Sequence, residues 1–341
     1  MKLLIHFGIY KAGSSYLQYI CANQKGYLAA NNIYFPESKE DDKMRKGLIS
    51  KGNADGLDSV LKKEDTSKIN TLLKKWHKIA KQKKCNTVLI SAEALVHQLA
   101  EQRKLNLIVN SSNAVGYTEI KAMGFFRNLA DHALSTYKHR AKSGAIPDYI
   151  HWVNNVYETP QVLENLTSVI ANNQCIKWTL RKFEKNSDFL KQAFFKDWME
   201  IKVPDFQTRP NVNESISLSE VKVMNHIRKI YPNVTDYFYE GFKNLSEKDK
   251  ADDKDLNAYV LNSFAKDLAK HDEIIHQINA YFTKNEKLVV GDYKETDLNE
   301  PTMKLSNTQF SCLMQKIQYF KTFEGKIVKL RRKGIGFVRK I

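Results

Sequence analysis

The sequence predicts an α/β fold in which a parallel sheet of about five strands is flanked by helices and followed by a C-terminal helical extension. Three stretches carry this prediction. Residues 1–28 begin with a short apolar run, pass through a loop of small residues and continue with the apolar periodicity of a helix. Residues 87–91 and 120–126 are short apolar runs bounded by polar residues, as in buried parallel strands. We expect a single domain over residues 1–341, since this length can bury a full core.

The composition is that of a globular protein with an anionic partner. Hydrophobic residues make up 42% of the chain, and 54 Lys and Arg against 38 Asp and Glu give a net charge of +16. This charge favours nucleotides, nucleic acid, acidic glycans or anionic lipid surfaces as partners. The four cysteines lack the spacing of a zinc site, so no metal is expected. The first apolar run is too short for a signal peptide and no stretch is long enough to span a membrane, which predicts a cytoplasmic location.

The first loop has the composition of an anion site. Gly13 permits a tight turn, Ser14 and Ser15 add hydroxyl donors, and Lys11 adds a positive charge at the start of a helix, where anions are favoured. Gly8 and Gly13 have the spacing of a Walker A loop, but Ser14 stands where that motif has its lysine. The pattern therefore predicts a phosphate loop that is not an ATP site. An ordinary strand-to-helix turn with a solvated lysine is the alternative.

The next segments lead to a second polar position beside this loop. Residues 31–36 are expected to form a short strand, and residues 37–84 a charged helical insertion whose clearest helical periodicity begins at Thr66. The strand at 87–91 should end close to the first loop, because ligands of open α/β sheets gather at the carboxyl ends of the strands. Glu93 would then lie beside a bound anion, unless it only complements the dipole of the helix that it opens.

An arginine directly follows the strand at 120–126. Arg127 and, eight residues later in a helix, Ser135 place two anion donors near the same edge of the sheet. A guanidinium suits a phosphate because its planar fork makes paired, charge-assisted hydrogen bonds. Arg127 could equally pair with Asp131 one helical turn later.

The two loops together carry a resemblance to the PAPS-dependent sulfotransferases, most closely to the soluble bacterial members that often modify carbohydrates. The segment Lys11-Ala-Gly-Ser-Ser15-Tyr-Leu-Gln is similar to the loop with which that family cradles a 5′-phosphosulfate. The segment from Arg127 to Lys138 is similar to the one whose arginine and serine hold the 3′-phosphate. Leu129 departs from the family pattern, since many members have proline there.

Two later segments extend the resemblance. Residues 178–184 resemble the family's strand that ends in an aromatic–Glu pair, and residues 209–217 resemble an Asn-x-Ser-Leu-Ser segment of bacterial members. The likeness thus covers roughly residues 1–230 in order. It implies a P-loop-type sheet and sulfuryl transfer from PAPS to an acceptor hydroxyl, on a carbohydrate or cell-surface glycan, with no metal required.

The resemblance also implies roles for single residues. Lys11 would lie near the bridging oxygen of the leaving phosphate, and the backbone N–H groups after it would hold the 5′-phosphate. Glu93 stands where the family has its catalytic base, and His97, one turn later, is the second candidate. Tyr16 and Phe183 are the candidates for adenine recognition. The implied nucleotide-binding residues are Lys11, Ala12, Gly13, Ser14, Ser15, Tyr16, Arg127, Ser135, Phe183 and Arg209.

The remainder of the chain is expected to be helical. Residues 217–285 form the predicted helical extension, beginning with a helix that Ser217 or Ser219 caps. The tail at 326–341 carries seven Lys and Arg and no acidic residue, interleaved with apolar residues. Such a tail can bind an anionic membrane surface or an acidic glycan, or simply cover the domain.

Two other classes of function remain open at this point. A P-loop kinase with a degenerate Walker loop would bind ATP with Mg²⁺, but Ser91 stands where such enzymes usually place an aspartate. A non-enzymatic anion- or nucleic-acid-binding protein fits the charge, yet the basic residues form no recognisable nucleic-acid module. The expected partners are therefore a nucleotide cosubstrate, an acidic or neutral carbohydrate acceptor and, through the tail, the inner face of a membrane, but no nucleic acid.

Overall fold

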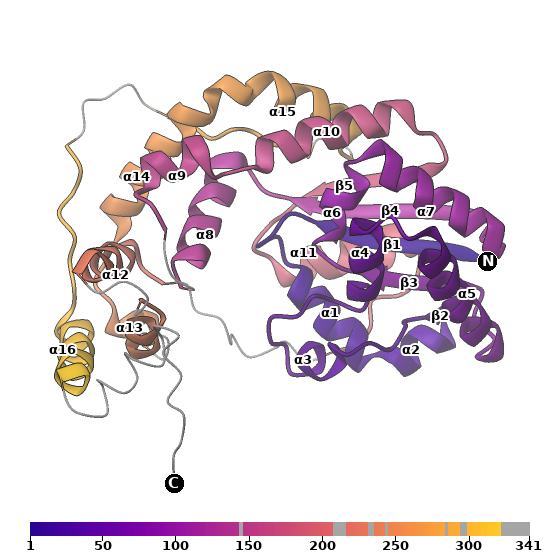
Figure 1. Cartoon of the computed structure of the whole chain (residues 1–341), viewed down its shortest axis with the longest axis horizontal. Coiled ribbons are helices and arrows are strands. Elements are labelled where there is room, and N and C mark those ends of the chain that lie inside the picture. The colour runs from indigo at the N-terminus through magenta and orange to yellow at the C-terminus, as the bar shows by residue number, and fades with distance from the viewer. Residues whose placement is uncertain are drawn as a thin grey trace, which may run out of the picture. The chain divides into compact units, whose positions relative to one another are not determined.

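The chain forms two compact units, which are described separately (Figure 1). The computed structural model describes residues 1–142, 146–206, 216–230, 235–242, 245–283, 286–293 and 299–321. The first unit comprises Met1–Leu129, Glu158–Val212 and Lys270–Val290. The second unit comprises Ala130–Tyr157, Asn213–Ala269 and Gly291–Ile341. The single domain over residues 1–341 stays a prediction.

The first unit is built on a five-stranded sheet in which every pairing is parallel. The strands follow the order β2-β3-β1-β4-β5. This arrangement confirms the predicted α/β class, the parallel sheet and its number of strands. Their bounds are β1 Lys2–Gly8, β2 Ile33–Tyr34, β3 Thr87–Ser91, β4 Glu119–Phe126 and β5 Ile176–Lys182.

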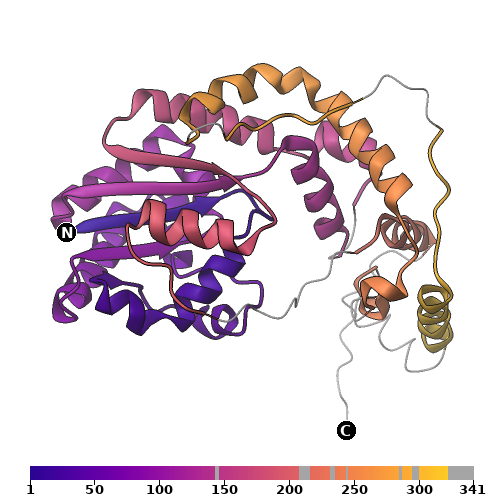
Figure 2. The same cartoon turned by 180° about the vertical axis from the view of Figure 1, so that it is seen from behind.

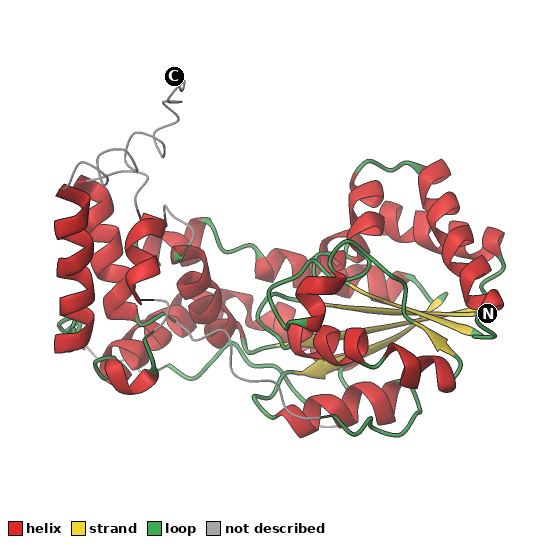
Figure 3. Ribbon diagram, turned by 90° about the horizontal axis from the view of Figure 1, so that it is seen from below, coloured by secondary structure: helices red, strands yellow, loops and turns green. Residues whose placement is uncertain are grey.

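The sheet is covered on both faces, which explains why its central strands are almost wholly apolar. All residues of β1 after Lys2 are buried. On one face the His6 ring packs against the Phe194 ring, with 5.0 Å between the ring centres. On the other face the Phe7 ring packs against the Trp178 ring, with 5.9 Å between the centres. Figure 3 shows helices above and below these strands.

The helices of the first unit connect the strands and cover both faces of the sheet. Figure 2 shows α11 and the π-helix after it lying across one of these faces. Three of the helices, α3 to α5, lie in the stretch at 37–84, where the sequence predicted a charged helical insertion. Their bounds are α1 Ser14–Asn23, α2 Lys25–Ala30, α3 Asp41–Arg45, α4 Asp55–Lys62, α5 Thr66–Gln82, α6 Leu95–Leu99, α7 Gln102–Val115, α10 Thr159–Asn172, α11 Ser187–Lys191, the π-helix Gln192–Trp198 and α15 Asp272–Ile278.

Every regular element described in the second unit is helical. Its core includes the rings of Tyr137, Trp152 and Phe264, which contact one another. The stretch at 217–285 holds α12 to α15, of which α15 belongs to the first unit, and the tail at 326–341 lies outside the described residues. The helix bounds are α8 Leu129–Ala141, whose first residue belongs to the first unit, α9 Tyr149–Asn155, α12 Leu218–Ile230, α13 Thr235–Phe242, α14 Lys254–Leu268 and α16 Asn307–Lys321.

Candidate functional site

The turn from β1 into α1 is shaped by glycine and by an unusual lysine backbone. Gly13 precedes the helix with φ 87°, in the left-handed region where glycine is favoured. A Cβ at Gly13 would lie 2.9 Å from Cε2 of Phe183, so a larger residue would also collide with that ring. Lys11 has φ 65°, a left-handed conformation that is uncommon for a residue with a side chain.

The first turn of α1 keeps hydrogen-bond donors available. The N–H groups of Tyr16 and Leu17 donate to the Gly13 carbonyl, and no side chain caps the helix. Among the described residues, the N–H groups of Ser14 and Ser15 have no backbone acceptor. The Ser14 residue is 1% exposed, and its Oγ makes no hydrogen bond of good geometry in the described part of the chain, although it lies close enough to the Glu93 carboxyl to lower its pKa. Buried donors without partners at a helix N-terminus are suited to an anion, which accepts their hydrogen bonds and interacts favourably with the dipole.

Two cationic side chains lie at this turn. Burial lowers the pKa of Lys11; the charge of Arg127 lowers it further, whereas that of Glu93 raises it. The Arg127 guanidinium donates from Nη1 to the Lys11 carbonyl oxygen over 3.3 Å. The backbone contact therefore ties the residue that follows β4 to the loop that follows β1, as expected if carboxyl ends of neighbouring parallel strands meet.

Phe183 joins the same cluster from the end of β5. Its N–H donates to the Phe126 carbonyl at 2.6 Å, which continues the pairing of β5 with β4 beyond the strand. The Arg127 guanidinium carbon lies 5.1 Å from the centre of the Phe183 ring, a cation–π contact. The ring thus lies close to both Arg127 and Gly13, and a planar aromatic side chain is present at the loop, as adenine recognition would require.

Glu93 brings a carboxyl group to the loop from the end of β3. The residue is half-buried, and burial raises the pKa of its carboxyl to about 7. The nearby Ser14 hydroxyl and the Lys11 charge lower this pKa, but their effect is smaller than that of burial. A carboxylate with a pKa near 7 can take a proton from a substrate and release it again at neutral pH.

His97 lies one turn after Glu93, on α6. Its ring is tilted against the Tyr10 ring with 6.3 Å between the centres, and Tyr10 is 40% exposed. Burial lowers the pKa of His97, so its imidazole is neutral at neutral pH. His97 therefore lies beside the loop and in the protonation state that a base needs, which keeps it as the second candidate.

Other residues named from the sequence are placed less directly. Ala12 is fully buried in the loop, and Ser15 is half-buried in the first turn of α1. Tyr16 is also half-buried there and lies near Lys191 on α11, whose pKa is raised chiefly by its hydrogen bond with Asp188. Ser135 lies on α8 in the second unit, and Arg209 lies outside the described residues, so their roles stay predictions.

A buried polar network behind the loop was missed from the sequence. His6 is fully buried on β1, and its Nδ1 is 2.8 Å from Ser91 Oγ. Gln18 donates from Nε2 to the same hydroxyl at 3.2 Å, and Asn53 accepts from the Ser91 N–H at 2.6 Å. A histidine inside an otherwise apolar strand was the one signal that could have revealed this network, because a buried polar group needs a partner.

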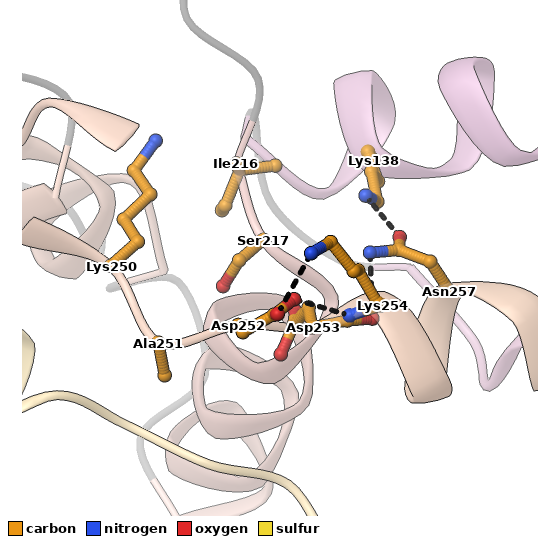
Figure 4. A pocket seen from close by; sticks show the side chains of 9 residues that line it. All are labelled: Lys138, Ile216, Ser217, Lys250, Ala251, Asp252, Asp253, Lys254 and Asn257. Atoms are coloured by element: carbon orange, nitrogen blue, oxygen red, sulfur yellow. Dashed lines mark hydrogen bonds and ion pairs between the residues drawn. The ribbon is translucent and has the colours of Figure 1, made fainter. Parts of the chain in front are cut away.

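The second unit contains a polar cavity of about 370 Å³ at the N-termini of α12 and α14 (Figure 4). Lys138 Nζ donates to Asn257 Oδ1 at 2.6 Å, and Lys254 pairs with Asp252 at 3.3 Å. These side chains already bond to one another, so the cavity wall is stabilised internally. The lining residues are Lys138, Ile216, Ser217, Lys250, Ala251, Asp252, Asp253, Lys254 and Asn257.

Comparisons with known proteins add no relative. The chain matches no protein-family model, no curated protein and no solved structure. Within the described residues, no cluster of three or more His, Cys, Asp or Glu side chains could hold a metal ion. No described helix is both long and apolar enough to cross a bilayer.

Proposed function

We propose that the protein is a PAPS-dependent sulfotransferase of the P-loop type, which transfers a sulfuryl group to an acceptor hydroxyl on a carbohydrate or cell-surface glycan. The observation that carries the proposal is the convergence of four features at the carboxyl ends of neighbouring strands. These are the unpartnered donors at the start of α1, Lys11, the Arg127–Phe183 pair and Glu93. The resemblance of the same segments to that family gives the convergence its chemical interpretation.

The chain's own groups fit the nucleotide that the resemblance implies. The N–H groups of Ser14 and Ser15 and the buried Ser14 hydroxyl are donors that a 5′-phosphate would satisfy. Arg127 offers a charged fork for a second phosphate, and the Phe183 ring offers a face for the base. The nucleotide supplies the activated sulfuryl group, and the protein holds it in place.

In the proposed reaction, Glu93 removes the proton from the acceptor hydroxyl as its oxygen bonds to sulfur. The bond between sulfur and the bridging phosphate oxygen breaks, and Lys11 neutralises the charge that develops on that oxygen. Adenosine 3′,5′-bisphosphate leaves, and the proton on Glu93 passes to solvent. In this scheme the protein accelerates the transfer chiefly by aligning the reacting groups and by stabilising the charge that develops.

The kinase alternative is less favoured by the contacts of Ser91. This residue occupies the position where a kinase needs a metal-holding aspartate, and its hydroxyl already bonds to His6 and Gln18. The anion-binding alternative explains the charge but gives no role to a carboxyl group whose pKa is raised to about 7 beside the cations. A carboxylate at an anion site weakens binding by repulsion, so its presence favours chemistry over binding alone.

Calorimetric titration of the full chain tests the proposal. Adenosine 3′,5′-bisphosphate and ADP are each titrated with and without Mg²⁺. We expect tight, metal-independent binding of the bisphosphate, which is lost in Arg127→Ala. Preference for ADP with Mg²⁺ would instead support the kinase, and binding of neither nucleotide would contradict both enzymes.

A further inference from the structure

The end of β3 is held by an unusual number of polar contacts at a single residue, Ser91. Its N–H donates to Asn53 Oδ1 at 2.6 Å, and its carbonyl accepts from the Ala54 N–H at 3.4 Å. Its hydroxyl accepts from Gln18 Nε2 at 3.2 Å and lies 2.8 Å from His6 Nδ1. Ser91 is only 1% exposed, and its N–H, carbonyl and hydroxyl groups all have hydrogen-bond partners.

The hydrogen-bond directions in this network follow from the donors present. The amide nitrogen of Gln18 can only donate, so the Ser91 hydroxyl is free to donate its proton to His6 Nδ1. His6 then carries its own proton on Nε2, which has no hydrogen-bond partner among the described residues and belongs to a ring packed edge-on against Phe194 at 5.0 Å. Burial lowers the pKa of His6 to about 3, so this neutral form persists at every pH at which the protein is expected to work.

The loop at residues 50–54, between α3 and α4, reaches the same point. Gly52 has φ 81°, and a Cβ on it would lie 2.0 Å from the Ser91 carbonyl oxygen and 2.7 Å from Gln18 Nε2. Ser50 Oγ donates to Gln18 Oε1 at 2.8 Å, which ties the loop to α1. Asn53 also donates to the Leu89 carbonyl at 3.1 Å. Only glycine permits this close approach of two backbones.

We infer that Gln18, Asn53 and the backbone of residues 50–54 are positioning groups, which hold the end of β3 and thereby the Glu93 carboxyl against the β1–α1 loop. Ser91 is separated from Glu93 by a single residue, Ala92, which is 1% exposed and whose N–H donates to the His6 carbonyl at 3.1 Å. The network that surrounds Ser91 therefore leaves little freedom for the backbone that carries Glu93. We call Gln18, Ser50, Gly52, Asn53 and Ala54 the Ser91 clamp.

The clamp gives the segment at 37–84 a role in the site. Without the clamp, Glu93 would be free to turn toward water, and its carboxyl would lose the burial that raises its pKa. The groups that act on the Glu93 carboxyl are the Ser14 hydroxyl and the Lys11 charge. None of these belongs to the clamp, so a clamp variant changes the position of Glu93 and leaves its charged neighbours in place. The catalytic meaning of the clamp rests on the proposed function, but its effect on the Glu93 carboxyl does not.

The test measures the Glu93 carboxyl directly and does not depend on activity. Glutamate labelled with ¹³C at the side-chain carboxyl is incorporated into the full chain, and Glu93→Gln assigns the signal. We expect Asn53→Ala and the milder Ser50→Ala to lower the pKa of Glu93 by at least one pH unit and by a few tenths of a unit, respectively. An unchanged pKa in both folded variants would overturn the inference.

A matched control separates positioning from loss of stability. Asn173 is 9% exposed and also accepts a backbone hydrogen bond, from the Cys175 N–H at 3.0 Å, but it lies before β5 at the opposite end of the sheet. Asn173→Ala should leave the pKa of Glu93 unchanged. If the pKa of Glu93 fell in Asn173→Ala as much as in Asn53→Ala, a general loss of stability, and not the clamp, would control that pKa.

Transfer kinetics then distinguish the clamp from the proposed function. Asn53→Ala should reduce kcat about 10-fold or more and shift the pH profile of kcat to lower pH, with less than a twofold change in bisphosphate affinity. A wild-type chain that neither binds the bisphosphate nor transfers sulfuryl groups contradicts the proposed function, and the carboxyl titration still decides the clamp. A wild-type chain that transfers, with Asn53→Ala unchanged in kcat and pH profile, contradicts the positioning role.

Discussion

The helices α1 and α12 begin in opposite ways. At α12, Ser217 and Glu220 form a reciprocal capping box: the Ser217 N–H donates to Glu220 Oε2 at 2.8 Å, and the Glu220 N–H donates to Ser217 Oγ at 3.1 Å. At α1, no side chain caps the helix, and the Ser14 hydroxyl is buried with no partner in the described part of the chain. Ser217 therefore caps α12, whereas Ser14 at the start of α1 is itself a donor without a partner among the described residues. The comparison shows that α12 is capped by its own residues, whereas the start of α1 keeps donors available, which is the basis of the nucleotide site proposed there.

The cations near the two helix ends follow the same distinction. In the cavity beside α12, Lys254 pairs with Asp252, and Lys138 donates to Asn257. At α1, Lys11 interacts with the carboxyl of Glu93, which burial keeps partly protonated near neutral pH. Unsatisfied donors and a carboxyl with a raised pKa are costly for folding, and such costs cluster at functional sites.

The largest expected effect comes from Lys11→Ala. Removal of the charge that neutralises the leaving oxygen should lower kcat about 100- to 1000-fold, measured as bisphosphate release with saturating PAPS and acceptor. Lys254→Ala, at the α12 cavity, should leave turnover within twofold of the wild type. Equal losses in both variants would remove the distinction between the two helix ends.

Glu93→Gln should lower kcat about 100-fold and keep bisphosphate affinity, because the amide keeps the shape but cannot accept the proton. In the wild type, kcat should rise with pH through about 7 and then level off, as the carboxyl becomes deprotonated. Full activity in Glu93→Gln would show that another residue is the base. Loss of activity in His97→Ala alone would identify His97 as that base.

The same substitution should also change stability in a pH-dependent way. The folded state holds the Glu93 proton up to about pH 7, whereas the unfolded chain releases it near 4.5, so the stability of the wild type falls as pH rises through this interval. Glu93→Gln removes this loss and should be more stable than the wild type at pH 8, by at most about 3 kcal/mol, but not at pH 4. Urea unfolding at the two pH values measures the difference. A variant less stable at pH 8 would contradict the burial of the charge.

Phe183→Ala should have a smaller effect, confined to nucleotide affinity. Loss of the ring beside Arg127 should weaken bisphosphate binding about 5- to 10-fold in calorimetric titration. Phe189→Ala is the matched control, since its ring makes a similar contact with Arg181 at 5.2 Å, and Arg181 is already paired with Glu286 and Asp197. Equal weakening in both variants would argue against a specific role for Phe183.

The smallest effects should come from the two serines and sharpen the comparison most. Ser217→Ala should lower the free energy of unfolding by about 1 kcal/mol, as loss of a helix cap does, without changing nucleotide binding. Ser14→Ala should keep or raise the free energy of unfolding, because it removes a buried hydroxyl without a partner, but weaken bisphosphate binding up to about 10-fold. The reverse pattern, with Ser14 needed for stability and Ser217 for binding, would overturn the interpretation of both helix ends.

The sheet and its strand-end residues were predictable because they follow from local patterns. Apolar runs at 87–91 and 120–126 fit only buried strands in this context, and the carboxyl ends of parallel strands meet at one edge. Lys11, Glu93 and Arg127 each follow such a strand closely, so their proximity needs no knowledge of the side-chain packing. The capping of α12 by Ser217 is also a local pattern and was one of the two alternatives that the sequence allowed.

The Ser91 clamp was not predictable for the opposite reason. Gly52 and Asn53 lie in a charged stretch of weak periodicity, where an asparagine beside glycine indicates only a turn. Their roles depend on the approach of two backbone segments that are far apart in sequence, since Asn53 and Ser91 are separated by 38 positions. No local pattern encodes such an approach. In the sequence, Ser91 is notable only because a kinase would have an aspartate at that position. In the structure, Ser91 is buried and lies at the centre of a polar network.

The order of the strands has a consequence for how the protein folds. The central strand β1 is the first to leave the ribosome, but its partners come much later, since Lys2 pairs with both Thr87 and Glu119. Contacts so distant in sequence make folding slow, because long loops must close before the strands can pair. The hydrogen bond from Arg127 to the Lys11 carbonyl therefore cannot form until β4 has been made. A nucleotide bound as proposed would contact groups that come together only in the completed sheet, and so would stabilise that sheet over its precursors.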